Sequence, residues 1–397
     1  MPLYTKIHSA TRKNGTVIGV VPFNRPLVAR NQLRYVNECF LSGKLSGDGE
    51  FTKRVSAAIR EIHNGSDALL TTSCTDALEM CALLLDIKEG DEVIVPSFTF
   101  VSSANAFFLL GARIVLVDID PNTLCISAES INKAISPKTR AIVCVNYAGV
   151  PSVTNEIASL ANEHGIVIIE DNAHGLFGST NDRPLGLDST FSTLSFHETK
   201  NVTCGEGGAL IINENKYLER AEIIREKGTN RKLFFKNLVD KYSWCDKGSS
   251  YLMSDINAAV LLAQLEERAE IQQRRQFAYE FYSNSLNEWA NKVGVTLPID
   301  REDSQSSFHL FHMILPNEQL RNDLLAYLNG CGIKAVFHYI PLHQSIVRSK
   351  YSIKVIDDCM NSENIASRLI RLPLFSSIET SEVEKVVNSV LNWFPNR

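Results

Sequence analysis

The chain has 397 residues, of which 44% are hydrophobic and 21% are charged, and this composition is typical of a globular protein with a large buried core. Forty Lys and Arg residues against 45 Asp and Glu residues give a formal net charge of −5. No basic run occurs, which argues against nucleic acid or an anionic membrane as a partner. No apolar run has the length of a membrane helix, no secretory pattern opens the chain, and the nine cysteines form no CxxC pair. We therefore expect a cytoplasmic protein with reduced thiols.

Short apolar runs alternate with helical patterns over the first half of the chain. We predict strands over residues 68–72, 92–95, 113–117, 141–145, 167–170, 190–196 and 209–212. The helical patterns cover 75–85, 101–110, 128–135 and 153–164, and a last one ends near 227. Strands that are apolar along their whole length and separated by helices indicate a mostly parallel seven-stranded sheet, flanked by helices on both faces. Ligands of such α/β sheets bind beyond the carboxyl ends of the strands.

A different pattern begins at Ser254, a candidate N-cap followed by Asp255 in the first turn. No Gly or Pro occurs from Asp255 to Ala290, which predicts either one long connecting helix or two helices. Strands over 309–315 and 335–339 and helices over 318–329 and 380–393 then indicate a smaller α+β unit. The predicted division is an N-terminal extension (1–19), a large domain (20–253), a connecting helix (254–290) and a small C-terminal domain (291–397).

Four weak signals fall at the carboxyl ends of the predicted strands. Asp171 follows the apolar strand 167–170, although it could simply cap the next turn. Lys200 follows the strand 190–196 and precedes the glycine-rich run 205–208, although an isolated loop lysine is usually exposed. The hydroxyl-rich segment 71–78 runs from a strand into a helix, where backbone N–H groups could bind an anion. The fourth is Pro96-Ser-Phe-Thr-Phe100, whose aromatic rings could stack on a flat ligand or belong to the core.

Together these groups supply what pyridoxal phosphate (PLP) requires of a protein. The amine binds the cofactor covalently, the carboxylate holds the pyridine nitrogen, the helix start binds the phosphate and the aromatic side chain covers the ring. Neither a Walker loop nor a GxGxxG motif follows any predicted strand, so no nucleotide-binding motif competes with this interpretation.

Five ordered motifs resemble those of the DegT/DnrJ/EryC1/StrS sugar aminotransferases, and the resemblance covers residues 20–395. The motifs are Pro96-Ser-Phe-Thr-Phe100, Glu170-Asp-Asn-Ala-His174, Ser195-Phe-His-Glu-Thr-Lys-Asn201, Gly205-Glu-Gly-Gly208 and Met253-Ser-Asp-Ile-Asn-Ala-Ala259. The resemblance implies PLP as the cofactor, the fold-type I architecture and a homodimer with active sites at the subunit interface.

The roles implied by the resemblance can be assigned residue by residue. Lys200 is the catalytic lysine, and the cofactor contacts are Asp171, His174, Thr75, Asp76, Ser195, Phe100 and, from the partner subunit, Ser250. Phe98 is the alternative to Phe100 as the ring cover. Ser250 departs from the Asn of many relatives, and Asn146 stands where relatives often have His.

A narrower resemblance within the family concerns the substrate. Segments 42–49, 225–231, 248–251 and 336–343 imply transfer of an amino group from L-glutamate to C4 of dTDP-4-dehydro-6-deoxyglucose, in the synthesis of enterobacterial common antigen. The candidate substrate contacts are Lys44, Arg231, His338 and His343, although surface solvation explains such residues equally well. His309 and His312 lack a third ligand at a suitable spacing, so we predict no metal site.

Three rival functions remain open from the sequence. A 3-keto sugar aminotransferase would share every cofactor residue. A sugar dehydratase of the family replaces the catalytic lysine with histidine, which Lys200 argues against. A non-catalytic sugar-nucleotide binder would keep the fold without needing both Lys200 and Asp171.

Overall fold

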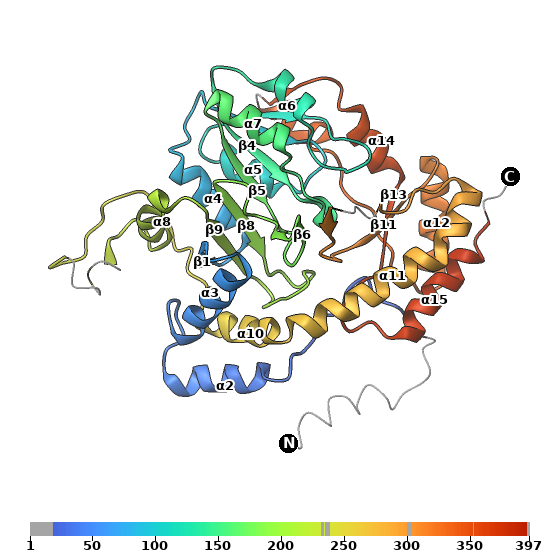
Figure 1. Ribbon diagram of the computed structural model, residues 1–397, viewed down its shortest axis with the longest axis horizontal. Helices are drawn as coiled ribbons and strands as arrows, with labels where there is room; N and C mark the ends of the chain where they lie inside the picture. Colours follow the sequence, from blue (N-terminus) through green and yellow to red (C-terminus); the bar gives the residue numbers. More distant parts are fainter. Residues whose placement is uncertain (1–18, 232–233, 235–238, 300–302, 352, 395–397) are drawn as a thin grey trace.

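The computed structural model describes residues 19–231, 234, 239–299, 303–351 and 353–394. The predicted extension 1–19 therefore lies, except for Gly19, outside the described residues. The protein has a mixed α/β fold built on an eight-stranded sheet (Figure 1). In order across this sheet the strands are β1 (Asp67–Thr71), β9 (Gly208–Ile212), β8 (Phe191–Ser195), β5 (Val167–Asp171), β4 (Thr139–Val145), β2 (Glu92–Pro96), β3 (Arg113–Val117) and β12 (Lys354–Val355).

The predicted mostly parallel arrangement is confirmed. Strand β9 pairs antiparallel with both of its neighbours, and the other pairs in the sheet are parallel. The seven predicted strands are all present, and the two-residue strand β12 adds an eighth at the edge beside β3. The carboxyl ends of β1, β8, β5, β4 and β2 consequently lie along one edge of the sheet, where they can bring distant loops together.

Helices cover both faces of the sheet, because alternate side chains of each buried strand point to opposite cores. Val93 and Val95 of β2 pack with α4 and α5, whereas Ile94 packs with α6 and α7. Helices α2, α3 and α10 form a third core with Leu70 and Ile211. The helices of this part are α2 (Gln32–Ser42), α3 (Glu50–Ile62), α4 (Cys74–Leu84), α5 (Ser102–Phe108), α6 (Ala128–Ala134), α7 (Asn155–His164) and α8 (Leu218–Arg225).

The long helical segment is two helices, α10 (Asp255–Glu266) and α11 (Arg268–Val293), which are separated at Glu267. Ser254 caps α10 as predicted, because its hydroxyl accepts a hydrogen bond from the backbone N–H of Asn257 (3.2 Å). In Figure 1, α11 runs from the main sheet toward the C-terminal elements. These two helices span the segment that we predicted to connect a large and a small domain.

The C-terminal elements form a further hydrophobic core with α11. Its strands β11 (Phe311–Ile314) and β13 (Leu369–Leu372) pair antiparallel. The strand predicted over 335–339 is wrong, because only Val336 bridges to Arg371 and the chain then leaves the sheet. The C-terminal helices are α12 (Glu318–Gly330), α13 (Ile346–Lys350), α14 (Met360–Arg368), α15 (Thr380–Leu391) and the short η3 (Leu342–Gln344). The remaining short elements of the described chain are the helices η1 (Tyr147–Gly149) and η2 (Asn215–Tyr217) and the strands β6 (Ser179–Thr180), β7 (Arg183–Pro184) and β10 (Ser304–Gln305).

A buried arginine of α11 joins the segments that lead into β11 and out of β13. The guanidinium of Arg275 donates hydrogen bonds to the carbonyls of Phe308 (2.9 Å), His309 and Leu374 (3.2 Å). Burial lowers the pKa of Arg275 to about 9. These carbonyls satisfy a cation that would otherwise be costly to bury, so one side chain holds two distant parts of the chain together.

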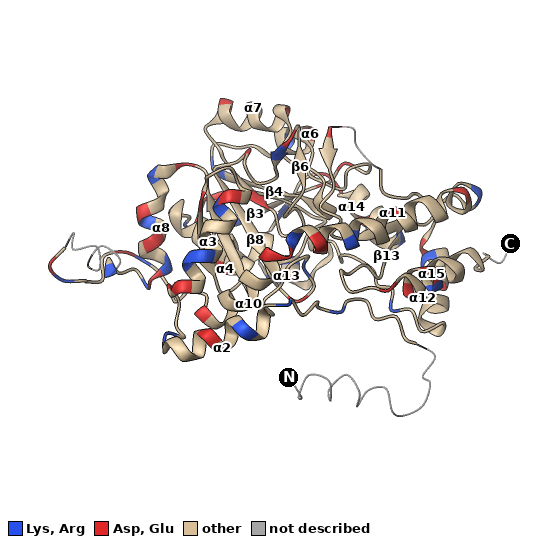
Figure 2. Ribbon diagram, turned by 60° about the horizontal axis from the view of Figure 1, so that its bottom comes forward, with Lys and Arg blue, Asp and Glu red and all other residues tan. Residues whose placement is uncertain are grey.

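The outer helices carry charges of both signs. In Figure 2, Lys and Arg alternate with Asp and Glu on α2, α3 and α8. Several exposed pairs on helices are ion pairs, such as Arg34–Glu38 (2.7 Å) and Lys292–Glu288 (2.7 Å). Among the described helices, none is both long enough and apolar enough to cross a membrane.

Candidate active site

A cavity of about 620 Å³ opens at the edge of the sheet where the carboxyl ends gather. This volume suits a small-molecule ligand. Its walls come from the segments after β1, β2, β5 and β8, from the segment that precedes β11 and from strand β13. Seven of the predicted site residues line it, namely Thr75, Phe100, Asp171, His174, Ser195, Lys200 and His338.

Lys200 lies in the loop after β8, where its backbone N–H donates to the carbonyl of His197 (2.9 Å). Its side-chain amine makes no hydrogen bond to any residue that the structure describes. Burial lowers the pKa of Lys200 to about 8, against the opposing effects of Cys74 and Asp171. An amine with that pKa is partly neutral near neutral pH, which is the form that acts as a nucleophile or a base.

Asp171 ends β5 and is 6% exposed. The hydroxyl of Ser103 donates to one carboxylate oxygen (2.6 Å), and the backbone N–H of Ala173 donates to the other (3.3 Å). Ser103 also bonds to Thr99 (2.8 Å). Burial raises the pKa of Asp171, so a cationic partner in the cavity would stabilise its charged form. The carboxylate is therefore oriented before any ligand binds.

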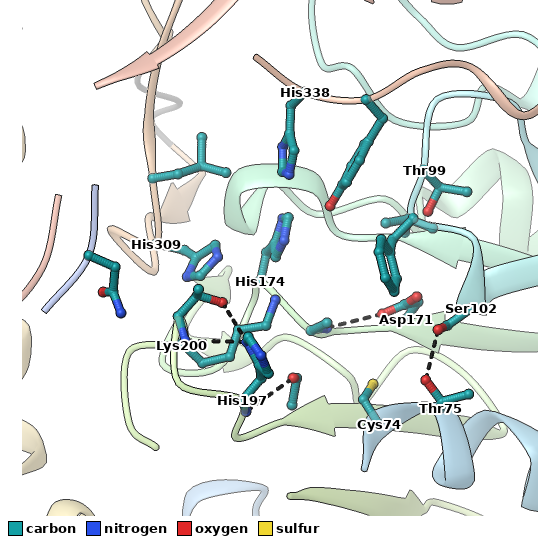
Figure 3. A pocket seen from close by; sticks show the side chains of 18 of the residues that line it. Cys74, Thr75, Thr99, Ser102, Asp171, His174, His197, Lys200, His309 and His338 are labelled. Atoms are coloured by element: carbon teal, nitrogen blue, oxygen red, sulfur yellow. Dashed lines mark hydrogen bonds between the residues drawn. The ribbon is translucent and has the colours of Figure 1, made fainter. Parts of the chain in front are cut away.

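The N-terminus of α4, the predicted anion seat, lies on the cavity wall. The capping hydroxyl of Ser73 accepts from the N–H of Asp76 (3.0 Å), whereas the N–H groups of Cys74 and Thr75 have no hydrogen-bond acceptor among the described residues. The hydroxyls of Thr75 and Ser102 are 2.7 Å apart (Figure 3). Free N–H groups at a helix start attract anions.

A glycine allows the sheet to approach this helix end. A Cβ atom on Gly208 of β9 would lie 2.4 Å from the backbone nitrogen of Cys74 and 2.4 Å from the carbonyl carbon of Ser73. Real side chains do not tolerate such contacts with backbone, so the glycine-rich run 205–208 contributes close packing at this point.

Two of the predicted phosphate contacts do not line the cavity. The carboxylate of Asp76 accepts a hydrogen bond from the hydroxyl of Thr72, and Asp76 contributes to the seat only through the capped helix turn. Ser250 is exposed and forms a bridge with Glu226. The cavity of this single chain is thus built without the side chains of Asp76 and Ser250.

The two phenylalanines after β2 have different environments. Phe98 is 1% exposed and packs in a core with Tyr147 (ring centroids 5.2 Å apart). Phe100 is 56% exposed and lines the cavity. A ring that reaches the cavity can cover a flat ligand, so the structure favours Phe100 over Phe98 for that role.

Aromatic rings stack along the wall above Lys200 (Figure 3). His174 stacks on His309 with centroids 4.3 Å apart, and His338 stacks on Tyr339 at 3.6 Å. The His338 ring also bonds to the Tyr147 hydroxyl (3.1 Å). Burial lowers the pKa of His174, His309 and His338, so these imidazoles are neutral and add hydrogen-bonding groups without charge.

The other predicted substrate contacts lie outside the cavity. Lys44 is exposed and its amine donates to Ser46 (2.9 Å), and Arg231 is an exposed partner of Glu226 (3.3 Å). His343 is buried, with its two ring nitrogens against Ser97 (2.6 Å) and Glu363 (2.9 Å). The structure does not support a substrate contact for His343, because both of its nitrogens are occupied.

Three residues of the cavity region escaped the sequence reasoning. Ser103 follows Thr99 by four residues. Two hydroxyl residues at this helical spacing do not by themselves indicate a functional site. His309 looked like a core or surface histidine, yet it is buried and lines the cavity. Arg371 lies in a short strand, and the sequence of that strand does not show whether the arginine faces solvent or the cavity. Within the described residues, no cluster of His, Cys, Asp and Glu could hold a metal ion.

Solved structures of similar fold include several aminotransferases. The aminotransferase TlmJ from Streptoalloteichus hindustanus is 28% identical with a TM-score of 0.86, and the match covers 94% of this chain and 98% of that chain. DesV from S. venezuelae is 27% identical with a TM-score of 0.83, over 91% and 94% of the two chains. Spr1654 from Streptococcus pneumoniae in its PLP form is 24% identical with a TM-score of 0.84, over 94% and 97%.

The family model for DegT/DnrJ/EryC1/StrS aminotransferases matches residues 26–391, which is nearly the whole chain. This match agrees with the mostly parallel sheet and with the cavity at its carboxyl edge. The chain belongs to the DegT/DnrJ/EryC1/StrS aminotransferase family.

Proposed function

We propose that the cavity binds pyridoxal 5'-phosphate and that the protein is a sugar-nucleotide aminotransferase. The observation that carries the proposal is the joint presence of the Lys200 amine, the oriented Asp171 carboxylate and the open N–H groups of α4 in one cavity. The cofactor has an aldehyde, a basic ring nitrogen and a phosphate, so its three polar ends match these three groups.

Bound PLP supplies an aldehyde that captures amines and a ring that withdraws electrons from the attached carbon. The chain supplies the rest. Lys200 would hold the cofactor covalently, and its amine, once released, would move a proton from the α-carbon of the donor to the cofactor carbon. Asp171 keeps a proton on the ring nitrogen through its negative charge, Thr75 and Ser195 hold the phosphate, His174 adjoins the ring oxygen, and Phe100 covers one ring face.

The proposed reaction transfers the amino group of L-glutamate to C4 of dTDP-4-dehydro-6-deoxy-D-glucose. The products are dTDP-4-amino-4,6-dideoxy-D-galactose, an amino sugar for polysaccharides such as enterobacterial common antigen, and 2-oxoglutarate. In this proposal two chains form a homodimer in the cytoplasm, Ser250 completes the phosphate seat of the partner's site, and Lys44 and Arg231 contact the nucleotide-sugar in the cleft between the subunits. Their exposure in the single chain is compatible with that arrangement. His338 contacts the sugar from within the same chain.

The alternative substrate is another nucleotide-linked keto sugar, with the keto group at C3 or with the opposite configuration of the product at C4. In this proposal the cavity residues named above contact the cofactor, so their identities do not indicate which of these keto sugars accepts the amino group. A non-catalytic sugar-nucleotide binder is disfavoured, because such a protein needs no partly neutral buried lysine beside an oriented carboxylate.

The test of the proposed function has two parts. Reduction of the PLP-treated protein with borohydride should add a pyridoxyl group to Lys200, detected by peptide mass spectrometry, and Lys200→Ala should lose it. Lys216→Ala is the matched control, since that amine is exposed beside Glu214 (2.5 Å). A pyridoxyl group that persists in Lys200→Ala would disprove the assignment. NMR of the product formed from the dTDP keto sugar and L-glutamate then identifies the aminated carbon, and an unchanged keto sugar contradicts the specific substrate.

A further inference from the structure

His309 has one ring nitrogen without a partner on the cavity wall. Its imidazole is 7% exposed and lines the cavity, in the segment that precedes β11. The Nδ1 atom lies 2.9 Å from the side-chain oxygen of Asn201, whereas Nε2 makes no hydrogen bond with any residue that the structure describes. Figure 3 shows the ring beside His174 and above Lys200. A nearly buried polar atom without a partner indicates a contact that a ligand completes.

The hydrogen bond to Asn201 determines which ring nitrogen of His309 carries the proton. The amide nitrogen of Asn201 donates to the carbonyl of Ser307 (2.6 Å) and to the side-chain oxygen of Gln272 (3.0 Å). A carbonyl only accepts, so the Asn201 amide is held with its oxygen toward His309, and Nδ1 of His309 must donate to that oxygen. Burial lowers the pKa of His309, so the ring is neutral and carries one proton. The Nε2 atom is therefore a hydrogen-bond acceptor.

The two neighbouring imidazoles have the opposite arrangement. The backbone N–H of Ala148 donates to Nδ1 of His174 (3.4 Å), so the ring proton of His174 is on Nε2. Nδ1 of His338 lies 3.1 Å from the hydroxyl of Tyr147. This hydroxyl has no other hydrogen-bond partner among the described residues, so it donates to His338. His174 and His338 thus offer N–H donors, whereas His309 offers an acceptor.

An acceptor on the cavity wall selects ligand groups that carry a proton. The two carboxylates of L-glutamate have only acceptor oxygens at neutral pH, so they gain nothing from Nε2 of His309. The amine of L-glutamate is the group that reacts. A keto sugar, in contrast, carries hydroxyl groups, and one of them is on the carbon next to the keto group. A hydroxyl can donate to a neutral imidazole nitrogen.

We propose that Nε2 of His309 accepts a hydrogen bond from the hydroxyl next to the keto group of the sugar acceptor, which is the C3 hydroxyl in the proposed substrate. The His174 ring stacked at 4.3 Å and the Asn201 amide hold the imidazole in place before the sugar binds. The charge of Lys200 contributes to the lowered pKa of His309, so the imidazole lies near the reacting amine. The inference rests on the proposed aminotransfer and goes beyond it by naming a residue that recognises a sugar hydroxyl.

The test compares two acceptors in a single turnover of the enzyme loaded with pyridoxamine phosphate, followed by absorbance. They are dTDP-4-dehydro-6-deoxy-D-glucose and its 3-deoxy form, which lacks the C3 hydroxyl. His309→Phe keeps a flat ring and removes the acceptor nitrogen. Its preference for the hydroxylated sugar should be about 2- to 13-fold weaker than that of the wild type, the range expected for one hydrogen bond between uncharged groups. Dividing the two preferences cancels the intrinsic reactivities of the two ketones.

His312→Phe is the matched control, because His312 is also a buried, neutral imidazole of this segment but does not line the cavity. This variant should keep the wild-type preference. His309→Gln should keep part of it, since its side-chain oxygen can accept. The donor half-reaction with L-glutamate should change little in His309→Phe. A His309→Phe enzyme with the wild-type preference would overturn the inference. So would equal losses in both half-reactions, which would place His309 on the Lys200 amine.

Equilibrium binding separates recognition from chemistry. The probes are dTDP-6-deoxy-D-glucose and dTDP-3,6-dideoxy-D-glucose, which have no keto group and cannot accept an amine. In calorimetric titration the wild type should bind the first more tightly, and His309→Phe should bind the two alike. Equal binding by the wild type would contradict the inference, and this comparison needs no variant to fold. A wild type that reacts with L-glutamate but with neither keto sugar would instead refute the proposed acceptor, and with it this inference.

Discussion

Gly208 offers a quantitative test of the contact between β9 and the N-terminus of α4. In Gly208→Ala the new methyl group would meet the Cys74 nitrogen and the Ser73 carbonyl group at 2.4 Å. Backbone atoms cannot rotate away, so strand and helix must separate by about 1 Å to reach ordinary contact distances. Overpacking of this kind costs about 1–3 kcal/mol, and the reduced entropy of the unfolded chain offsets about 0.4–1 kcal/mol of it.

The assays for Gly208→Ala are urea unfolding of the cofactor-free protein and titration with PLP. We expect a free energy of unfolding lower by about 1.3 kcal/mol, the difference between the middle values of the two ranges. We also expect PLP affinity to fall about tenfold or more, because the open N–H groups of the helix move away from the phosphate. Gly330→Ala is the control, since among the described residues, apart from its chain neighbours and its own helix backbone, no atom lies within 4 Å of its Cβ position at the end of α12. Wild-type stability and PLP affinity in Gly208→Ala would refute the close-packing argument.

Two further predictions concern the groups around the candidate cofactor. Ser103→Ala removes the hydroxyl that orients Asp171 (2.6 Å) and bonds to Thr99 (2.8 Å), so the free energy of unfolding should fall by about 1.5–3 kcal/mol in urea denaturation. The control is Ser349→Ala, because the exposed Ser349 hydroxyl donates only to the Ile346 carbonyl in its own helix turn, and the free energy of unfolding should change little. Equal losses in the two variants would contradict the buried role of Ser103. The rate of attachment of PLP to the cofactor-free protein should rise with pH through about 8, because only the neutral Lys200 amine reacts and its pKa is lowered. A rate that keeps rising only above pH 10 would show a lysine with an ordinary pKa.

The sheet and the chemical centre of the site were predictable because both depend on local patterns. Strands buried on both faces are apolar throughout, as Val93, Ile94 and Val95 show, and this pattern located all seven predicted strands. Parallel strands then placed Asp171 and Lys200 at one edge before their distance was known.

The remaining site residues depend on contacts between segments far apart in the sequence. Ser103 meets Asp171 across 68 residues, and His309 meets Asn201 across 108. Arg371 lies between the buried residues Ile370 and Leu372, as a solvent-facing residue of a strand would, and only the packing of the C-terminal unit places it on the cavity wall. The predicted strand over 335–339 failed for a related reason, because His338 and Tyr339 leave the sheet to line the cavity.

The Arg275 guanidinium has a consequence for attempts to change the selectivity of this enzyme. It joins the backbone before β11 to the backbone after β13. The first of these segments carries His309, and the second directly follows the strand that carries Arg371. If one segment alone is replaced by that of a relative, its backbone carbonyls would no longer lie within hydrogen-bond distance of the Arg275 guanidinium. Successful chimeras should therefore exchange both segments together with the α11 helix that joins them.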